Sequence, residues 1–361
     1  MTIASSSLRG IAGVEYWAYV IPIAIRWVEE QRTESTRYLN LMPATSDSDY
    51  ILRAIALARR GMALASPGTL VGAVIVSNGA VVGEAFYTWD GLHHAETLAL
   101  QQAGAAARGS TVYTSLEPCA HTGRTPPCAQ ALIDAGVARV VTAMEDPNPK
   151  VSGRGIAMLR EAGIAVECGL LKDEAARMNE AFLTRVIRNR AFGILKIAMT
   201  LDGKIATSSG ESQWITSDES RTEVQGLRHT VDAAITGSGT FLTDRPQLTD
   251  RTGLPRRREL LRVVLDRRGR VEKAPGWLVV RGGFNDLHAE LEQREIQSFL
   301  LECGPDLAFS ALESGIIPSS AVRKGAKPED SRNKRDRATI LGASPHFVRI
   351  TSRPPSSVKI K

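Results

Sequence analysis

Hydrophobic and polar positions along the first half of the chain predict a sheet flanked by helices. Asp47 begins a helix in which Ile51, Ala54 and Ile55 recur at helical spacing. Short β-rich runs then alternate with amphipathic stretches. Strands are predicted at Leu70–Val76, Ala80–Phe86, Ser110–Ser115, Val137–Ala143 and Ile164–Cys168, and helices at His94–Ala106, Cys128–Ala135 and Gly153–Ala162. The order β-β-α-β-α-β-α-β is typical of an α/β domain.

The second half predicts another α/β domain, reached through a connecting helix at Leu171–Asn189. Strands are expected at Gly193–Met199, Asp232–Thr236, Leu260–Leu265, Gly276–Val280 and Ser298–Glu302, and helices at Asp218–His229 and Pro305–Ser314. We therefore expect an N-terminal extension outside any core (1–45), a first domain (46–170), a linker helix (171–190), a second domain (191–318) and a basic, disordered tail (319–361).

Composition and charge narrow the functional classes. The chain has 361 residues, of which 43% are hydrophobic and 23% charged, as in ordinary globular proteins. The most apolar N-terminal run, 16–28, is too short to span a membrane and contains Arg26, so a cytoplasmic protein without membrane contact is expected. Residues 319–361 hold 11 Lys and Arg against 3 Asp and Glu, so the formal charge of +6 comes from this tail. The body of the chain has no bias towards polyanions such as nucleic acid.

Three residues have the chemistry of a zinc site. Four cysteines are too few for a disulfide scaffold, and Cys119 and Cys128 each follow a proline, which favours a helix start and a thiolate. With His94 they make a nitrogen-and-sulfur ligand set that suits zinc and leaves a fourth position for water, as in catalytic sites. Glu96 can converge on the same ion only if His94 lies at the helix entrance, and it would then carry protons.

Alternatives remain open at this point. The pattern His-x-Glu with Pro-Cys and a second Cys is a zinc-deaminase signature, although here eight residues separate the cysteines instead of two. A four-ligand structural zinc site that uses His93 or His121 is one alternative, and no metal at all is another. A nucleic-acid-binding or base-editing protein that uses the basic tail is an alternative of a different class.

The run Thr114–Cys128, with Gly-Arg-Thr-Pro-Pro between the cysteines, resembles the deaminase half of the bifunctional riboflavin-biosynthesis deaminase/reductase family. Ala143–Pro149 and Val151–Gly155 are similar to it too, and the resemblance runs from about Asp49 to Ile317. It implies a cytidine-deaminase-like zinc domain at 46–170. The implied reaction is hydrolytic deamination of 2,5-diamino-6-(5-phosphoribosylamino)pyrimidin-4(3H)-one, with zinc on His94, Cys119 and Cys128 and with Glu96 as catalytic residue.

The second domain offers weaker motifs of its own. Ala234–Thr240 runs from a strand into a Gly-rich turn that could cradle a dinucleotide phosphate. The basic group at 267–270 could receive a 2′-phosphate. The alternative for each motif is an ordinary turn without a binding role. The runs Met199–Ala206 and Ser212–Thr216 resemble the family's reductase half, which has a dihydrofolate-reductase-like fold. The resemblance implies NADPH-dependent reduction of the ribosyl group to ribityl, and an oligomer contact within this domain. It places Ala198, Trp214, Thr240, Asp244 and Gly304 at the cofactor, and Ser212, Arg228, Leu248, Arg251 and Glu302 at the substrate.

The chain departs from the family pattern at three places. Gly68 stands where the family has an asparagine expected to hold the substrate ring, and Arg267 where it has a serine near the cofactor. After Ile317 the resemblance stops, so the reductase sheet is expected to be incomplete at its C-terminus. An alternative therefore keeps the deaminase and treats the second domain as a degenerate or substrate-holding module.

Overall fold

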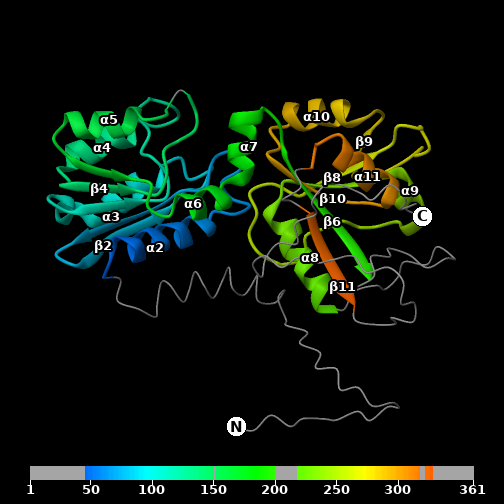
Figure 1. Ribbon diagram of the computed structural model, residues 1–361, viewed down its shortest axis with the longest axis horizontal. Coiled ribbons are helices and arrows are strands. Elements are labelled where there is room, and N and C mark those ends of the chain that lie inside the picture. Colours follow the sequence, from blue (N-terminus) through cyan, green and yellow to red (C-terminus); the bar gives the residue numbers. More distant parts are fainter. Residues whose placement is uncertain (1–44, 150, 201–217, 318–321, 328–361) are drawn as a thin grey trace, which may run out of the picture.

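The computed structural model describes residues 45–149, 151–200, 218–317 and 322–327, which form two α/β domains side by side (Figure 1). Each domain has a hydrophobic core of its own. The helix α7 lies between the two domains in this view. Within the described residues, no helix is both long and apolar enough to cross a bilayer.

The first domain is built on a five-stranded sheet with the order β2-β1-β3-β4-β5. The strands are β1 (Gly72–Ser77), β2 (Ala80–Phe86), β3 (Thr111–Thr114), β4 (Arg139–Thr142) and β5 (Ala165–Cys168). β1 runs antiparallel to β2 and β3, whereas β3, β4 and β5 are parallel. The predicted order of elements is therefore confirmed, with strand ends that differ by one or two residues.

The helices of this domain cover the sheet above and below in the view of Figure 1. They are α2 (Asp47–Arg59), α3 (Ala95–Ala103) with a 3₁₀ turn (Gly104–Ala107), α4 (Cys128–Ala135) and α5 (Arg154–Glu161). α2 begins at a capping box, in which Ser46 and Asp49 each accept a hydrogen bond from the other's backbone N–H. A Cβ at Gly72 would lie 2.0 Å from the Ala54 carbonyl oxygen, so glycine lets α2 pack closely on β1.

The predicted connecting helix is divided in two, α6 (Lys172–Met178) and α7 (Glu180–Arg188). The division falls at Asn179, which is 2% exposed. Its Oδ1 accepts hydrogen bonds from Leu70 N and Thr69 Oγ1, both at 2.9 Å, and its Nδ2 donates to Leu70 O. These bonds to the strand-entry loop fix a non-helical backbone at Asn179, and Ala175 of α6 is part of the first domain's core.

The second domain is a six-stranded, fully parallel sheet with the order β11-β6-β10-β7-β8-β9. Its strands are β6 (Phe192–Thr200), β7 (Ala233–Gly237), β8 (Leu261–Leu265), β9 (Leu278–Val280), β10 (Ser298–Glu302) and β11 (Val322–Lys327). Its helices are α8 (Asp218–Thr230), α9 (Ser238–Asp244), α10 (Phe284–Gln293) and α11 (Pro305–Glu313). The carboxyl ends of the strands therefore meet at one edge, where ligands bind in open α/β sheets.

Three elements of this domain differ from the sequence expectations. The Gly-rich stretch after β7 forms the helix α9 instead of a turn. The helix α10 was not predicted, although Leu287 and Leu291 recur at helical spacing and are both buried. Val322–Lys327, expected in a disordered tail, pairs in parallel with Leu195–Thr200 of β6 as strand β11. Main-chain pairing at an open sheet edge does not require the apolar pattern that the sequence analysis looked for.

Candidate active sites

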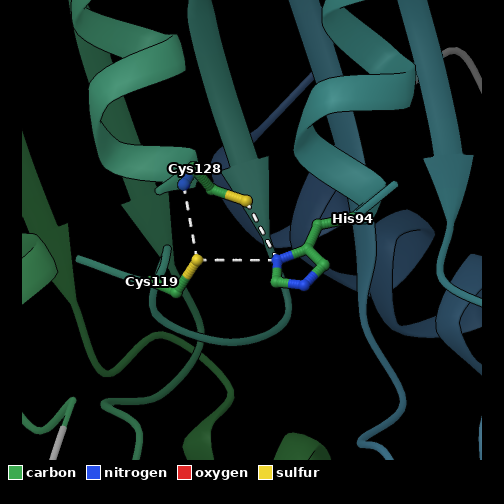
Figure 2. Close-up of side chains that lie close together, drawn as sticks. All are labelled: His94, Cys119 and Cys128. Carbon is green, nitrogen blue, oxygen red and sulfur yellow. Dashed lines mark hydrogen bonds between the residues drawn. The ribbon is translucent and has the colours of Figure 1, made fainter. Parts of the chain in front are cut away.

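His94, Cys119 and Cys128 converge in the first domain, as Figure 2 shows. Their ligand atoms all lie within 4.8 Å of one another. His94 Nδ1 is 3.1 Å from Cys128 Sγ and 3.5 Å from Cys119 Sγ. One imidazole nitrogen and two sulfurs at such distances fit the donor set and size of a zinc site.

Local structure explains why these three side chains meet. His94 precedes α3 as its N-cap, with φ −72° and ψ 160°, so the expectation that it lies at the helix entrance is confirmed. Cys128 is the first residue of α4. Cys119 differs from expectation because it lies in a loop, yet its Sγ accepts a hydrogen bond of 3.3 Å from Cys128 N. Both sulfurs therefore lie at the start of α4, where amide dipoles favour thiolate.

The cluster also favours one charged sulfur before any metal is added. The hydrogen bond from the Cys128 thiol, more than that from His94, lowers the pKa of Cys119 to about 4 and outweighs the opposing effect of burial. The hydrogen bond with Cys119 in turn raises the pKa of His94. A thiolate is the form of cysteine that binds metal.

Glu96 lies in the first turn of α3 and is 3% exposed. Its Oε2 is buried and has no hydrogen-bond partner among the described residues. Burial raises the pKa of Glu96 to about 7, against the lowering effect of the His94 charge. A carboxyl group with this pKa exchanges protons readily at neutral pH.

Neither His93 nor His121 belongs to the candidate zinc cluster. Among the described residues, the only group of three or more side chains that could hold a metal ion consists of His94, Cys119 and Cys128. The geometry thus matches a three-ligand site with an open position better than a four-ligand structural site.

Glu117, two residues before Cys119, is a residue that the sequence analysis missed. Its buried carboxylate accepts four backbone N–H bonds: Oε2 from Asp146 and Gly153, and Oε1 from Gly155 and Ile156, at 2.9 to 3.2 Å. A Cβ at Gly155 would lie 1.8 Å from Pro118 O, so α5 approaches this loop closely. Glu117 therefore fixes the Cys119 loop against the start of α5.

Gly68 has little space around its α-carbon in this fold. A Cβ at Gly68 would lie 2.8 Å from the Tyr87 ring, 2.9 Å from the Ala65 carbonyl oxygen and 3.3 Å from the Trp89 ring. A side chain at position 68 would require these neighbours to move.

In the second domain, Glu302 and two cations gather at the carboxyl edge of the sheet. Arg228 Nε and Nη2 donate to the two carboxylate oxygens of Glu302 at 2.7 and 3.0 Å. Arg228 Nη1 also donates to Thr249 O at 3.3 Å, so the guanidinium is held from two sides. Lys196 Nζ of β6, which the sequence analysis missed, lies 3.8 Å from Glu302 Oε2.

The structure describes most of the other expected reductase residues. Leu248 is buried with φ +45°, and exposed Arg251 donates from Nε to Thr249 Oγ1 at 3.1 Å. Gly304 precedes α11, and a Cβ there would lie 3.8 Å from Thr240 Oγ1 of α9. Ala198 lies near the end of β6, and Asp244 is the exposed last residue of α9. Ser212 and Trp214 lie outside the described residues.

The basic stretch after β8 reaches the start of α9. Arg270 Nη2 donates to Ser238 Oγ at 2.9 Å, while Arg267 and Arg268 are exposed. The stretch is therefore arranged around the buried Asp266 carboxylate, which accepts a hydrogen bond from Val271 N at 2.8 Å.

Two family models cover most of the chain between them. Residues 44–144 match the cytidine and deoxycytidylate deaminase zinc-binding region, and residues 191–322 match the RibD C-terminal domain. These matches identify the His/Cys/Cys cluster as part of a zinc-binding deaminase region.

Relatives match this chain across both domains. The riboflavin biosynthesis protein RibD of Escherichia coli is 41% identical over 317 residues, which span 76% of this chain and 86% of that protein. The Haemophilus influenzae protein is 39% identical over 313 residues, 76% of this chain and 84% of that one.

Solved structures agree over both domains. Acinetobacter baumannii RibD matches with a TM-score of 0.71 and 37% identity, covering 82% of this chain and 88% of that one. A second match is a Thermotoga maritima protein described as a diaminohydroxyphosphoribosylaminopyrimidine deaminase/5-amino-6-(5-phosphoribosylamino)uracil reductase. Its TM-score is 0.71 and its sequence identity is 33%, and the match covers 80% of this chain and 88% of that one. The chain belongs to the RibD family of bifunctional deaminase/reductase enzymes of riboflavin biosynthesis.

Proposed function

We propose that the first domain deaminates 2,5-diamino-6-(5-phosphoribosylamino)pyrimidin-4(3H)-one, with zinc held by His94, Cys119 and Cys128. The observation that carries this proposal is the cluster itself, whose ligand atoms lie within 4.8 Å of one another at the starts of α3 and α4. Zinc, when bound there, supplies a Lewis acid that makes water a nucleophile at neutral pH.

Glu96 transfers the protons in this proposal, first as general base and then as general acid. Its Oε2 is buried and has no partner among the described residues, so it is free to accept a proton from the attacking water. The same oxygen then donates a proton to the departing amine, which leaves as ammonia. The pKa of about 7 suits both halves of this task, because the carboxyl group must be basic first and acidic afterwards.

The second domain, in our proposal, then reduces the ribosyl group of the deaminated product to ribityl. NADPH, when bound, supplies the hydride. Thr240, Asp244, Gly304, Ala198 and Trp214 are the proposed cofactor contacts, and the closeness of Gly304 to Thr240 supports a shared site.

On the substrate side, Ser212, Arg228, Leu248, Arg251 and Glu302 are the proposed contacts. Lys196 joins them because it lies 3.8 Å from Glu302. With Arg228 paired to Glu302, the remaining positive charge of Lys196 and Arg251 suits a phosphate group. A cytoplasmic location fits the proposal, since the four cysteines are free thiols and the zinc ligands require reduced sulfur. A homo-oligomer through this domain remains our expectation.

Zinc content and ammonia release, measured together, test the deaminase proposal. Purified protein is expected to hold about one zinc per chain and to release ammonia from the diaminopyrimidine substrate. A chelator should remove both, and added zinc should restore both. Protein that releases ammonia at full rate without zinc would overturn the proposal.

NADPH consumption on the deaminated substrate separates the reductase from the degenerate-domain alternative. Loss of nicotinamide absorbance upon addition of the aminouracil ribosyl phosphate supports a working reductase. No consumption by folded protein that still releases ammonia supports the alternative.

A further inference from the structure

Arg257 of the reductase domain contacts two segments of the deaminase domain. Its N donates to Ala63 O at 2.9 Å, and its Nη1 donates to Ser66 O at 3.1 Å. Its Nε donates to Asp90 Oδ1 at 2.9 Å, and its guanidinium carbon lies 5.3 Å from the centroid of the Trp89 ring. One residue of the reductase domain therefore holds two separate segments of the deaminase domain.

Both segments lie beside the zinc cluster. The segment 87–93, which we call the ligand loop, leads directly from β2 to His94. The Tyr87 ring packs edge-on against the His94 ring, with the two ring centroids 5.5 Å apart. A hydrogen bond of 3.0 Å from Trp89 N to a carbonyl oxygen of the turn 63–68 joins the second segment to the ligand loop. A displacement of the ligand loop would therefore move groups that contact His94.

The loop between the two cysteine ligands contacts the same tryptophan. Arg124, which lies between Cys119 and Cys128 in the chain, donates from Nη1 to Trp89 O at 2.9 Å. Its guanidinium carbon lies 4.4 Å from the centroid of the Trp89 ring, so two cations approach this ring. Trp89 thus links Arg257, in the reductase domain, to the loop that carries the cysteine ligands.

The ligand loop contains strained backbone that needs support from outside the loop. Leu92 has φ +63°, a left-handed conformation that costs free energy in a non-glycine residue. The Leu92 side chain is 50% exposed, so its own packing compensates little of this cost. Strain of this kind persists where neighbouring contacts hold the backbone. The ion pair of Asp90 with Arg257 supplies such a contact two residues before Leu92.

We propose that Arg257 is a positioning residue for deamination. The reductase domain uses it to fix the ligand loop, and this loop in turn fixes the side of the deaminase site that receives the substrate. The inference rests on the proposed deaminase function and adds to it a dependence of substrate binding on the second domain.

The metal ligands and the proton carrier are held in another way. His94 and Glu96 lie at the start of α3, whose Ala95 and Ala99 belong to the first hydrophobic core. This packing holds the chemical groups without Arg257. Loss of Arg257 is therefore expected to weaken substrate binding and to leave zinc binding and the chemical step nearly unchanged.

Steady-state ammonia release by the zinc-loaded, full-length protein tests the proposal. Arg257→Ala should raise KM for the diaminopyrimidine substrate about fivefold to tenfold, while kcat and zinc content stay within about twofold of the parent values. Arg257→Lys keeps the positive charge and should recover part of the loss. Arg108→Ala removes an exposed arginine of the deaminase domain and is the matched control, which should keep the KM of the parent.

Two other roles of Arg257 predict different results. If Arg257 only fastened the domains together, Arg257→Ala would alter thermal unfolding but leave KM for deamination unchanged, and that outcome would overturn the proposal. If Arg257 were a phosphate contact shared by both reactions, KM would also rise for NADPH consumption on the deaminated substrate. We expect that second KM to stay at the parent value, and an equal rise of both would overturn the proposal.

Asp90→Ala provides a second variant that is expected to fold, because the Asp90 side chain is 71% exposed. It should raise KM for deamination about twofold to threefold, as suits the loss of an exposed ion pair. In the Arg257→Ala background the same change should have no further effect on KM, since both residues act through one contact. Fully additive effects on kcat/KM would overturn the link through the ligand loop.

Hydrogen exchange of the zinc-loaded protein without substrate measures the loop itself. In Arg257→Ala the Trp89 amide should exchange about tenfold faster or more, while the amide of Ala99 in α3 should exchange as in the parent. Equal KM values and equal Trp89 exchange in Arg257→Ala and the parent would overturn this inference and leave the proposed function intact. A zinc-loaded parent that releases no ammonia would overturn the proposed function, and this inference with it.

Discussion

Glu96 differs from the exposed carboxylates of this protein because its Oε2 atom is buried and lacks a partner among the described residues. Its position two residues after His94 suggested a role in proton transfer, but the spacing alone required His94 to stand outside the regular helix. The N-cap geometry of His94 meets that requirement. The pKa of about 7 follows from burial, which a sequence does not report.

Glu96→Gln should retain zinc and fold while deamination falls by roughly 10²- to 10⁴-fold, because the change removes the proton carrier and no ligand. Ammonia release and zinc content per chain are the measurements. Glu161→Gln, an exposed glutamate at the end of α5, is the control and should behave as the parent does. Full activity in Glu96→Gln would show that another group moves the proton.

At the scale of elements, single buried carboxylates fix loops to the ends of helices. Glu117 joins the loop before Cys119 to the start of α5 through four backbone N–H groups. Asp250 joins the loop after α9 to the end of α8: its Oδ2 lies 2.8 Å from His229 Nδ1 and 3.1 Å from Arg256 Nη1. Neither role was visible in the sequence, because the partners are main-chain groups or distant side chains.

Glu117→Gln should lower the free energy of unfolding by about 1–3 kcal/mol, since the amide nitrogen would face N–H groups that need an acceptor. Denaturant unfolding of the zinc-loaded protein measures the change. The exposed Glu161→Gln variant, with the same chemical substitution, should lose less than about 0.5 kcal/mol. Similar stability of the two variants would contradict the proposed role of Glu117.

The lowered pKa of Asp250 predicts that the protein loses stability in acid. Burial alone would raise the pKa of Asp250, but hydrogen bonds from Thr252 N and His229 lower it below its ordinary value of 3.8. A carboxyl with a lowered pKa in the folded state stabilises the fold above pH 3.8 and loses that contribution as the pH falls through its folded pKa. Asp250→Asn should therefore be less stable than the parent at about pH 7 by about 1–3 kcal/mol, with a smaller gap at about pH 3.

Unfolding curves at several pH values provide the measurement for Asp250. Glu313→Gln, an exposed site at the end of α11, is the control and should follow the parent at every pH. A gap between Asp250→Asn and the parent that does not shrink in acid would contradict the assignment.

At the scale of the whole molecule, two separate cores are joined by polar contacts and by α7, whose Leu183 packs against the first core and whose Ala181 packs against the second. The deaminase core and the reductase core share no buried residue among those that the structure describes. Arg257 makes a large part of the connection, since it contacts Asp90 and Ser66 and lies 5.3 Å from the centroid of the Trp89 ring. Polar junctions of this kind couple domains weakly.

Arg257→Ala should lower the free energy of coupling between the two domains by about 1–2 kcal/mol. Their thermal transitions should then move apart by a few degrees. Scanning calorimetry measures the separation, and a chelator identifies the deaminase transition by lowering it. Glu161→Gln, which changes an exposed residue at the end of α5, should leave the separation unchanged. An unaltered profile in Arg257→Ala would mean that other contacts couple the domains.

Most of the elements and the chemistry of the zinc cluster could be predicted from the sequence, whereas several local features could not. The helix Cys128–Ala135 and the strand Ser298–Glu302 occur with the predicted bounds, because buried strands and capped helices leave periodic patterns. The break at Asn179 could not be predicted, since it depends on bonds to Thr69 and Leu70, which lie more than a hundred residues away.

The amino-acid sequence by itself determined two α/β units, the ligand types of the metal cluster and the family pattern that names the two reactions. These depend on periodicity and on residue identity, which are local properties. Only the tertiary structure decided that Glu96 Oε2 is buried without a hydrogen-bond partner among the described residues, and that Glu302 is paired with Arg228 beside Lys196. Burial, pairing and unmet hydrogen bonds arise from contacts between distant segments, so they exist only once the chain is folded.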